Sequence, residues 1–413
     1  MKYLIVLADG SADEPIESLG GKTPLEVAHI ACINDLASKG EIGSARTVPP
    51  GISPGSDSAN LSVMGYDPRR YLTGRSPLEA AAIGVNMTDE DISFRANFIT
   101  VDPDGHDNYE DFIIRDHAAG DISTEDCTVL LNLMNEKFQT ENLKFYPGTS
   151  YRHCLLLNRS HPNGHTEYKF VPPHDILDKP AREYLPKGEN AEFIINMMKE
   201  SYEILKDHPI NKDRIAKGLN PANSLWIWGQ GTRPDLPDFN KKFGVKGSVF
   251  SAVDLIKGIG IFAGIHVVDV PGATGTIHTD YEAKVRAAVS EYERGQNFVY
   301  MHMEGTDECS HQGKLNEKIK CIEYIDGRIV KPLYDYLKNT GEDFKIMILP
   351  DHRTPLSIRT HSSDPVPFVI YDSRNETPVD YKKQFNERAA AESGNYFEKG
   401  YTLADHFFLE KKL

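Results

Sequence analysis

Five acids and histidines in the last third of the chain follow apolar runs of strand-like composition. Asp307 and His311 come just after residues 298–303, Asp351 and His352 come just after residues 344–349, and His361 lies further along. Because residues four apart share one face of a helical turn, Asp307 and His311 can hold one ion. Carboxylates and imidazoles without thiolates suit Mn, Zn, Co or Mg. Since open α/β sheets bind ligands where their strands end, the pattern predicts a divalent-metal site.

Residues 54–60, PGSDSAN, offer a hydroxyl group that could act as a nucleophile, and we assign that role to Ser58. Gly55 and Ala59 leave room for a ligand to approach, although turns of this composition are also ordinary loop chemistry. No histidine adjoins the loop to form a triad, and the G-x-S-x-G elbow is absent. The hydroxyl group therefore needs metal ions to become nucleophilic at neutral pH.

Alternating strands and helices are expected to position these groups. Residues 3–8 form an apolar run typical of a strand covered on both faces. Asp9 follows this run, and it is either a candidate site residue or simply the first residue of a turn. Helix caps are predicted at Thr23, Ser76 and Thr279. Further strands are expected at 265–270, 298–303, 344–349 and 366–371, and a long helix at 315–337 should kink at Pro332.

The middle of the chain differs in character from its two ends. From about residue 86 to residue 244, a short alternating strand run is followed by turns and mixed elements. Strands alternate with helices on either side of it, which indicates a parallel sheet. The sequence therefore predicts an α/β core with a mainly parallel sheet flanked by helices, made of 1–85 and 245–413. A second α+β domain, 86–244, interrupts it.

The composition excludes several classes of protein. Lys and Arg number 46 against 61 Asp and Glu, so the net charge of -15 argues against nucleic acid and anionic membrane as partners. Five cysteines without a C-x-x-C pair suggest reduced thiols and a cytoplasmic location. No apolar stretch reaches the roughly 18 residues of a membrane helix. The oligomeric state stays open, and a homo-oligomer is compatible with the sequence.

Several motifs together resemble one family. They are Asp9-Gly10, the run from Gly55 to Pro68, residues 73–80 (TGRSPLEA), residues 307–311 and the stretch from Pro350 to Pro367. Over essentially its full length the chain resembles the archaeal-type cofactor-independent phosphoglycerate mutases of the alkaline phosphatase superfamily. Cys309 and Ser310 differ from the Ala and Gly that relatives tend to have there, which affects the expected local packing and leaves the ligand set unchanged.

The resemblance implies an alkaline-phosphatase-like core that carries two divalent metal ions and an insert that closes over 3-phosphoglycerate. One ion would be held by Asp9, Ser58, Asp351 and His352, and the other by Asp307, His311 and His361. Ser58 would take the phosphoryl group, the glycerate would reorient without leaving, and its 2-hydroxyl would attack phosphoserine to give 2-phosphoglycerate. We prefer Ser58 to Ser56 because the Asp-Ser-Ala order resembles the nucleophile of the superfamily.

The substrate carries a carboxylate and a phosphate, which require cationic side chains. The candidates are Arg95, Arg152, His153 and Arg233 from the insert and Lys257 from the core. Two alternatives to the mutase remain open. One is a metal-dependent phosphomonoesterase, or a mutase acting on another phosphorylated metabolite. The other is a metal-binding protein without turnover.

Overall fold

Two sheets organise the chain in the computed structural model, which describes residues 1–409. One unit comprises Met1–Leu72 and Asp235–Leu413, and the other comprises Thr73–Pro234. Among the described residues, no helix combines the length and the apolarity needed to cross a membrane. The expected α/β core interrupted by a second α+β domain is confirmed.

The first unit contains an eight-stranded sheet in the order β13-β2-β12-β11-β1-β10-β8-β9. Its strands are β1 (Lys2–Ala8), β2 (Glu41–Ala45), β8 (Gly247–Phe250), β9 (His266–Val267), β10 (Phe298–Met303), β11 (Phe344–Leu349), β12 (Val366–Asp372) and β13 (Tyr396–Phe397). The central strands β11, β1, β10 and β8 are parallel, whereas β12 is antiparallel to both of its neighbours. The sheet is therefore mainly parallel, as predicted.

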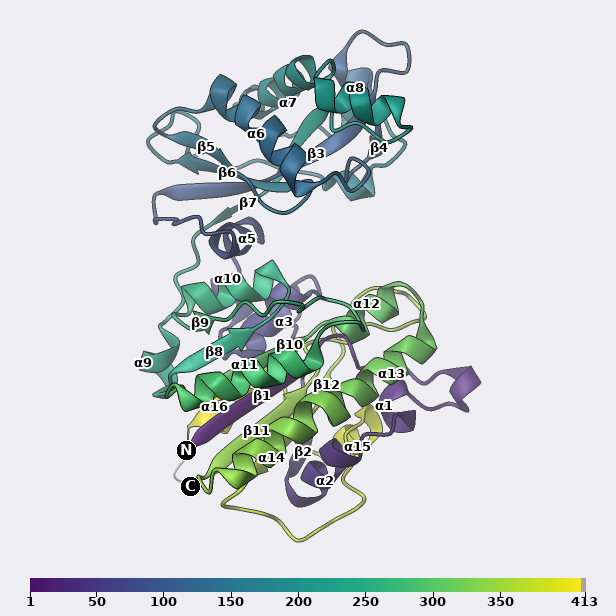
Figure 1. Ribbon diagram of the computed structural model, residues 1–413, viewed down its shortest axis with the longest axis vertical. Coiled ribbons are helices and arrows are strands. Elements are labelled where there is room, and N and C mark those ends of the chain that lie inside the picture. Colours follow the sequence, from purple (N-terminus) through teal and green to yellow (C-terminus); the bar gives the residue numbers. More distant parts are fainter. Residues whose placement is uncertain (410–413) are drawn as a thin grey trace. The chain divides into compact units, whose positions relative to one another are not determined.

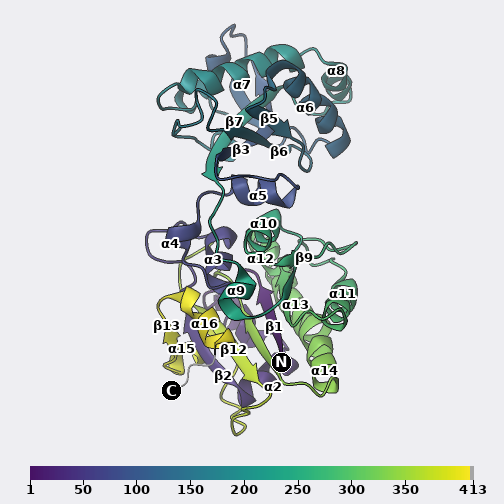
Figure 2. The ribbon, with the colours of Figure 1, turned by 90° about the vertical axis from the view of Figure 1, so that its left-hand side faces the viewer.

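Helices cover both faces of this sheet (Figures 1 and 2). On one face, Leu4 and Val6 of β1 share a core with helices α11, α13 and α14. On the other face, Tyr3 packs on Phe407 and Phe408 of α16. The helices of this unit are α1 (Pro24–Val27), α2 (Ala31–Lys39), α3 (Ser56–Val63), α4 (Pro68–Tyr71), α9 (Phe239–Phe243), α10 (Asp254–Phe262), α11 (Tyr281–Glu293), α12 (Gly305–His311), α13 (Leu315–Ile325), α14 (Lys331–Asn339), α15 (Glu387–Glu392) and α16 (Leu403–Phe408).

The second unit is built on antiparallel strands around the long strand β3 (Asp91–Asp102). This strand pairs with β4 (Ile113–Asp116), β6 (Arg152–Asn158) and β7 (Ser224–Thr232), and β5 (Leu143–Tyr146) pairs with β6. Helices α6 (Thr124–Phe138) and α7 (Ala191–Leu205) pack on the sheet in one apolar core. The remaining helices are α5 (Ser76–Ala82) and α8 (Pro209–Ala216).

The boundaries of the second unit differ from the expected range of 86–244. The unit begins at Thr73 because α5 belongs to it: Ser76 hydrogen-bonds Ser93 of β3, and Ala80 packs against Cys154 of β6. It ends at Pro234 because Phe239 stacks on Phe298 in the core of the first unit. The last four residues of the expected core range, 410–413, lie outside the described part of the chain.

Local predictions were correct at some element ends and wrong at others. Thr23 and Glu26 form the predicted capping box. The cap of α11 is Asp280, since Thr279 instead accepts a hydrogen bond from the Thr274 amide, and Ser76 caps nothing. The expected strand at 265–270 is limited to the two residues of β9, at the edge of the sheet.

The long helical segment after residue 315 is interrupted by a π-helical turn just before the proline at which a kink was predicted. A π-helical turn, Asp326–Val330, separates α13 from α14, and Pro332 lies in the first turn of α14. Proline is tolerated there because the first turn of a helix has no intrahelical acceptor for its missing N–H. The turn buries Asp326, which accepts hydrogen bonds from the Cys32 and Ile33 amides at the start of α2.

Candidate active site

Three neighbouring parallel strands bring the predicted metal ligands to one edge of the sheet. Strand β1 lies between β10 and β11, and all three run in the same direction. Asp9 follows β1, helix α12 with Asp307 and His311 follows β10, and the pair Asp351 and His352 follows β11. Within the described residues, two groups have side-chain atoms close enough to share a metal ion: Asp9, Asp351 and His352, and Asp307, His311 and His361.

The first group is almost completely buried. His352 Nε2 lies 3.6 Å from Asp9 Oδ1 and 3.5 Å from Asp351 Oδ2. Asp9 Oδ1 is buried and accepts no hydrogen bond. Burial, followed by the charges of Asp351 and Asp307, raises the pKa of Asp9 well above its usual value. A buried carboxylate oxygen without a donor, beside other carboxylates, is the environment that a cation stabilises.

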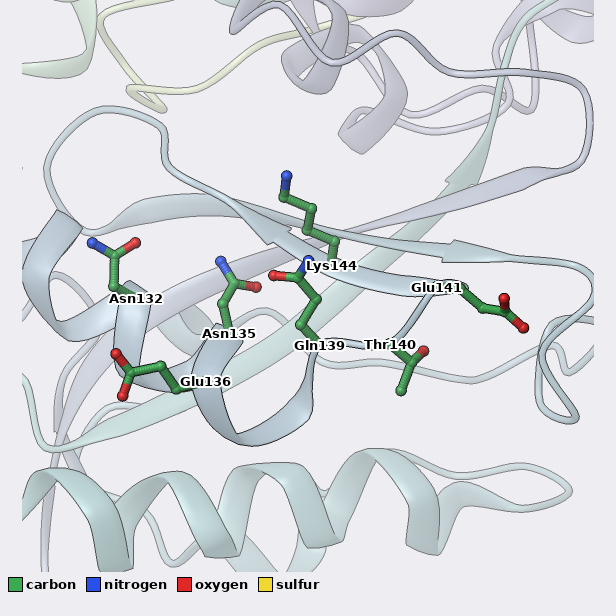
Figure 3. Close-up of a pocket in the computed structure, with 7 residues that line it drawn as sticks. All are labelled: Asn132, Asn135, Glu136, Gln139, Thr140, Glu141 and Lys144. Atoms are coloured by element: carbon green, nitrogen blue, oxygen red, sulfur yellow. The ribbon is translucent and has the colours of Figure 1, made fainter.

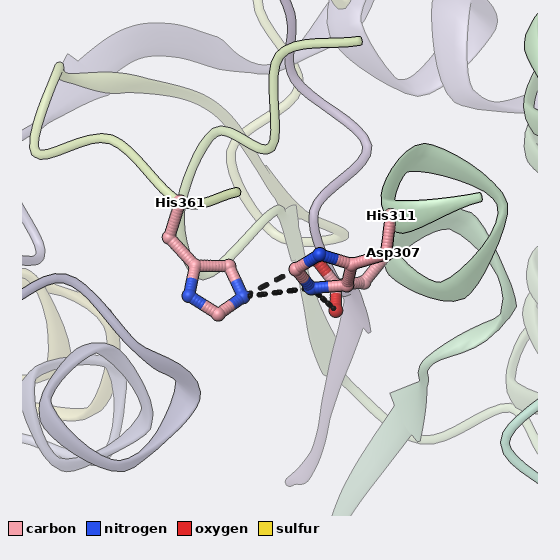
Figure 4. A group of neighbouring side chains, drawn as sticks. All are labelled: Asp307, His311 and His361. Atoms are coloured by element: carbon pink, nitrogen blue, oxygen red, sulfur yellow. Dashed lines mark hydrogen bonds and ion pairs between the residues drawn. The ribbon is translucent and has the colours of Figure 1, made fainter. Parts of the chain in front are cut away.

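The second group is drawn in Figure 4, where the two imidazoles face each other beside Asp307. His311 Nε2 lies 3.1 Å from His361 Nε2 and 3.0 Å from Asp307 Oδ2. His311 Nδ1 lies 2.9 Å from the Arg359 carbonyl, so Nδ1 carries the proton and the lone pair of Nε2 is available to a metal. Two ring nitrogens and a carboxylate that converge in this way fit a divalent cation.

Buried polar residues hold the first group in place. His302 Nε2 lies 3.0 Å from Asp9 Oδ2, and its Nδ1 lies 3.1 Å from Ser251 Oγ. Asn60 donates to Asp351 Oδ2 at 2.9 Å and accepts from the Tyr300 hydroxyl at 2.6 Å. None of these residues was predicted to support the site, although Asn60 lies in the same segment as Ser58 and His302 is a histidine inside the apolar run of β10.

The hydroxyl groups of Ser56 and Ser58 lie in different environments. The Ser58 hydroxyl is buried and donates to the Gly55 and Ser53 carbonyls, at 3.0 and 3.3 Å. Ser56, two residues earlier, has its Oγ 3.2 Å from His352 Nε2 and is only half-buried. Both serines lie in α3, and residues two apart on a helix point in different directions. Of the two hydroxyl groups, that of Ser56 is the one beside a predicted metal ligand.

Among the cationic side chains predicted to bind substrate, Arg95 is held in place by both an ion pair and an aromatic ring. Its Nε bonds Glu79 at 2.8 Å, and its guanidinium lies 4.1 Å from the centre of the Trp228 ring. Burial lowers the pKa of Arg95; Glu79 opposes that shift, and the nearby charges of Arg75 and Arg152 add to it. Three guanidinium groups therefore lie near one another within the second unit. The sequence analysis missed Arg75.

The other side chains predicted to contact the substrate lie in different environments. Arg152 is exposed and lies over the Tyr151 ring, and Arg233 forms an ion pair with Asp89 at 2.9 Å. Lys257 forms an ion pair with Asp269 at 2.7 Å in the first unit.

His153 lies in a different environment from the predicted arginines. It is buried, packs against Phe98 and accepts a hydrogen bond from the Gly148 amide at 3.1 Å. Burial lowers its pKa to about 3, so the imidazole is neutral at pH 7. In this state the ring of His153 carries no positive charge for a substrate anion.

A hollow in the second unit lies between the end of α6 and the edge strand β5 (Figure 3). Asn135 donates to and accepts from the Phe145 backbone, so its amide occupies the place of a neighbouring strand. The lining holds Glu136 and Glu141 against a single cation, Lys144. This charge balance disfavours an anionic ligand, and none of the predicted site residues lines the hollow.

Comparison with known proteins covers nearly the whole chain. Residues 37–211 match the family described as 2,3-bisphosphoglycerate-independent phosphoglycerate mutase. A protein of that name from Methanothrix thermoacetophila is 46% identical over 394 residues, which are 95% of this chain and 96% of that protein.

Two solved structures share the fold over their full lengths. A protein from Pyrococcus horikoshii has a TM-score of 0.78 at 30% identity, with 98% of this chain and 96% of that one covered. The cofactor-independent phosphoglycerate mutase of Thermoplasma acidophilum has a TM-score of 0.64 at 26% identity, with 98% and 99% covered.

Proposed function

Because the chain belongs to the 2,3-bisphosphoglycerate-independent phosphoglycerate mutases, we propose that it interconverts 3-phosphoglycerate and 2-phosphoglycerate through a phosphoserine at Ser56. The observation that carries this proposal is the position of the Ser56 hydroxyl, 3.2 Å from His352 Nε2 in the first metal-ligand group. A half-buried hydroxyl beside metal ligands can reach both a metal and a substrate.

The two groups would hold two divalent ions, Mn, Zn, Co or Mg. Asp9, Asp351, His352 and the Ser56 hydroxyl would hold one, and Asp307, His311 and His361 would hold the other. When bound, such ions lower the pKa of a hydroxyl nucleophile and share the charge of the transferring phosphoryl group.

Ser56 Oγ attacks the phosphorus of 3-phosphoglycerate while the bond from phosphorus to the 3-oxygen breaks. The proton that Ser56 loses balances the one that the 3-oxygen gains. The glycerate stays bound and reorients, and its 2-hydroxyl then attacks phosphoserine, which restores the serine. Retention of glycerate is essential, because if it dissociated, water would hydrolyse the phosphoserine and the enzyme would act as a phosphatase.

The second unit would bind the anionic substrate through its arginines. Arg95 is held by Glu79 and Trp228, so little of its conformational freedom remains to be lost on binding. Arg75 and Arg152 lie near it and are exposed to solvent. An arginine matches the planar geometry of a carboxylate or phosphate, and three of them suit a substrate that carries both groups.

The five cysteines are free thiols, and four of them are buried. This state suits the reducing conditions of the cytoplasm, where we place the reaction.

The proposal is tested by an enolase-coupled assay of the Mn-loaded protein with 3-phosphoglycerate, without added 2,3-bisphosphoglycerate. Free phosphate is measured in parallel. Enolase signal without phosphate release supports a mutase, and phosphate release alone supports a phosphomonoesterase. Absence of both signals refutes 3-phosphoglycerate as the substrate.

Two serine variants test the nucleophile. Ser56→Ala should abolish turnover, whereas the matched control Ser58→Ala should retain it, because the Ser58 hydroxyl contacts only backbone carbonyls. The reverse result would restore the original choice of Ser58. Normal metal content in both variants would show that any loss of activity comes from the missing hydroxyl and not from loss of a metal ion.

A further inference from the structure

One buried hydroxyl lies between the two metal-ligand groups. Thr354 Oγ1 donates to Asp307 Oδ1 at 2.6 Å and lies 3.2 Å from His352 Nδ1. Thr354 is completely buried, so water does not compete for these bonds. A single side chain thus contacts one ligand from each group.

The hydrogen bonds of Thr354 determine the protonation of His352. A threonine hydroxyl has one proton and can accept through its lone pairs. Because Thr354 gives its proton to Asp307, His352 Nδ1 must be the donor in the second bond. His352 Nε2 then has a free lone pair, directed toward Asp9, Asp351 and Ser56. The hydroxyl therefore selects the tautomer that a metal ion requires.

The backbone around Thr354 is fixed by a second set of buried bonds. The Thr354 amide donates to the Ala12 carbonyl at 3.2 Å. Lys318 Nζ donates to the Thr354 carbonyl at 3.0 Å and to Asp13 Oδ2 at 2.7 Å, and both charged side chains are buried. These contacts tie the segment after β11 to α13 and to the segment after β1. The position of the hydroxyl therefore does not depend on its two ligand contacts alone.

Gly10 makes room for the hydroxyl. A Cβ atom at this position would lie 2.5 Å from Thr354 Oγ1 and 2.6 Å from Asp307 Oδ1. Only glycine allows the chain after Asp9 to pass this close to the hydrogen bond between Thr354 and Asp307.

We infer that Thr354 is a positioning residue that couples the two metal-ligand groups. The inference rests on the proposed function in that the two groups hold metal ions. An ion at Asp307 fixes the carboxylate that the hydroxyl faces, and the fixed hydroxyl orients His352 for the other ion. Because coupling between binding sites is reciprocal, an ion in the first group favours one in the second to the same degree.

The experiment measures metal binding instead of turnover. Metal-free protein is titrated with Co²⁺, and the visible absorption bands report the affinity and geometry of the sites. Thr354→Val and Thr354→Ala remove the hydroxyl with and without filling its space, whereas Thr354→Ser retains it. Thr100→Val is the matched control, since Thr100 is also buried but bonds only the Pro221 carbonyl in the second unit.

Both hydroxyl-free variants should bind Co²⁺ about 10- to 100-fold more weakly, with altered absorption bands, as found for partners that orient metal ligands. Thr354→Ser should restore wild-type binding, and Thr100→Val should leave it unchanged. In a His361→Ala background, where the second group is incomplete, Thr354→Val should still weaken binding by the first group through His352.

Wild-type affinities in the Val and Ala variants would overturn the inference. Weaker binding in Ser and Ala with wild-type binding in Val would also overturn it, because Val keeps the methyl group that Ser and Ala lack, and the loss would then come from methyl packing. If the Val variant does not fold, the comparison of Ala with Ser decides. A protein that binds Co²⁺ as expected but gives no enolase signal refutes the proposed substrate and leaves the role of Thr354 standing.

Discussion

Replacement of Gly10 by alanine tests how tightly the segments of the site are packed. Gly10 has a φ of +63°, and its missing Cβ would lie within 2.8 Å of three atoms of Thr354 and Asp307. Gly20 is a matched control, because its φ is +68° and a Cβ there would meet nothing within 4 Å. Both substitutions impose the same backbone strain, and only one of them creates a clash.

The difference between the two variants can be worked out from these contacts. A left-handed conformation costs a residue with a Cβ roughly 1–2 kcal/mol, which both variants share. Gly10→Ala adds overpacking of about 1–3 kcal/mol. It also breaks the bond between Thr354 and Asp307, a hydrogen bond to a charged group worth about 1.5–3 kcal/mol. Gly10→Ala should therefore be less stable than Gly20→Ala by roughly 3 kcal/mol or more.

The chain contains its own internal reference for this measurement. Both tryptophans, Trp226 and Trp228, lie in β7 of the second unit. In urea titrations, tryptophan fluorescence follows the second unit and far-ultraviolet ellipticity follows both. Gly10→Ala should move the ellipticity transition of the first unit to lower urea and leave the fluorescence transition in place. Equal stability of the two glycine variants would refute the packing argument.

Three further predictions concern other parts of the molecule. Lys318→Met leaves the buried carboxylate of Asp13 without its cation and should cost about 3–5 kcal/mol of unfolding free energy. The exposed-pair control Lys331→Met should leave the unfolding free energy almost unchanged, and similar losses in the two variants would contradict the role of burial. His153 has a folded pKa of about 3 against an unfolded value near 6.5, so only the unfolded state gains a proton on acidification. The stability of the second unit should fall by about 2 kcal/mol from pH 7 to pH 5, and His153→Gln should remove that dependence; an unchanged slope would show that His153 does not cause it. Finally, a Mn²⁺ concentration 100-fold above the Kd of a metal site should stabilise the chelator-treated protein by about 2.7 kcal/mol for each ion bound, and an unchanged melting temperature would argue against metal binding.

The sequence predicted which residues form the two candidate metal-ligand groups because strand ends leave a clear signal. Buried parallel strands are continuous apolar runs, and an acid or histidine directly after such a run lies at the ligand-binding edge. Asp9 and Asp351 were found in this way, as was the turn that carries Asp307 and His311. That β1 lies between β10 and β11, which brings these residues together, is a property of the sheet order and is not visible in any one segment.

The choice between Ser56 and Ser58 could not be made from the sequence because it depends on where one helix begins. Helix α3 starts at Ser56, and only that hydroxyl is directed to His352. The environment of His153 was equally hidden. A histidine beside Arg152 at the start of a strand looks solvated in the sequence, whereas the pairing of β3 with β6 buries it against Phe98.

The position of β1 in the middle of the sheet bears on how the protein is made. This strand is synthesised before both of its partners, because β1 ends at Ala8 whereas β10 and β11 begin at Phe298 and Phe344. At about 5–20 residues per second, the nascent chain carries an unpaired, apolar strand for some tens of seconds before either neighbour is synthesised. The second unit, encoded between them, can complete its own sheet during that interval. Biosynthesis therefore favours folding of the insert before the core, and a chaperone that binds nascent apolar segments has its longest opportunity at residues 2–8.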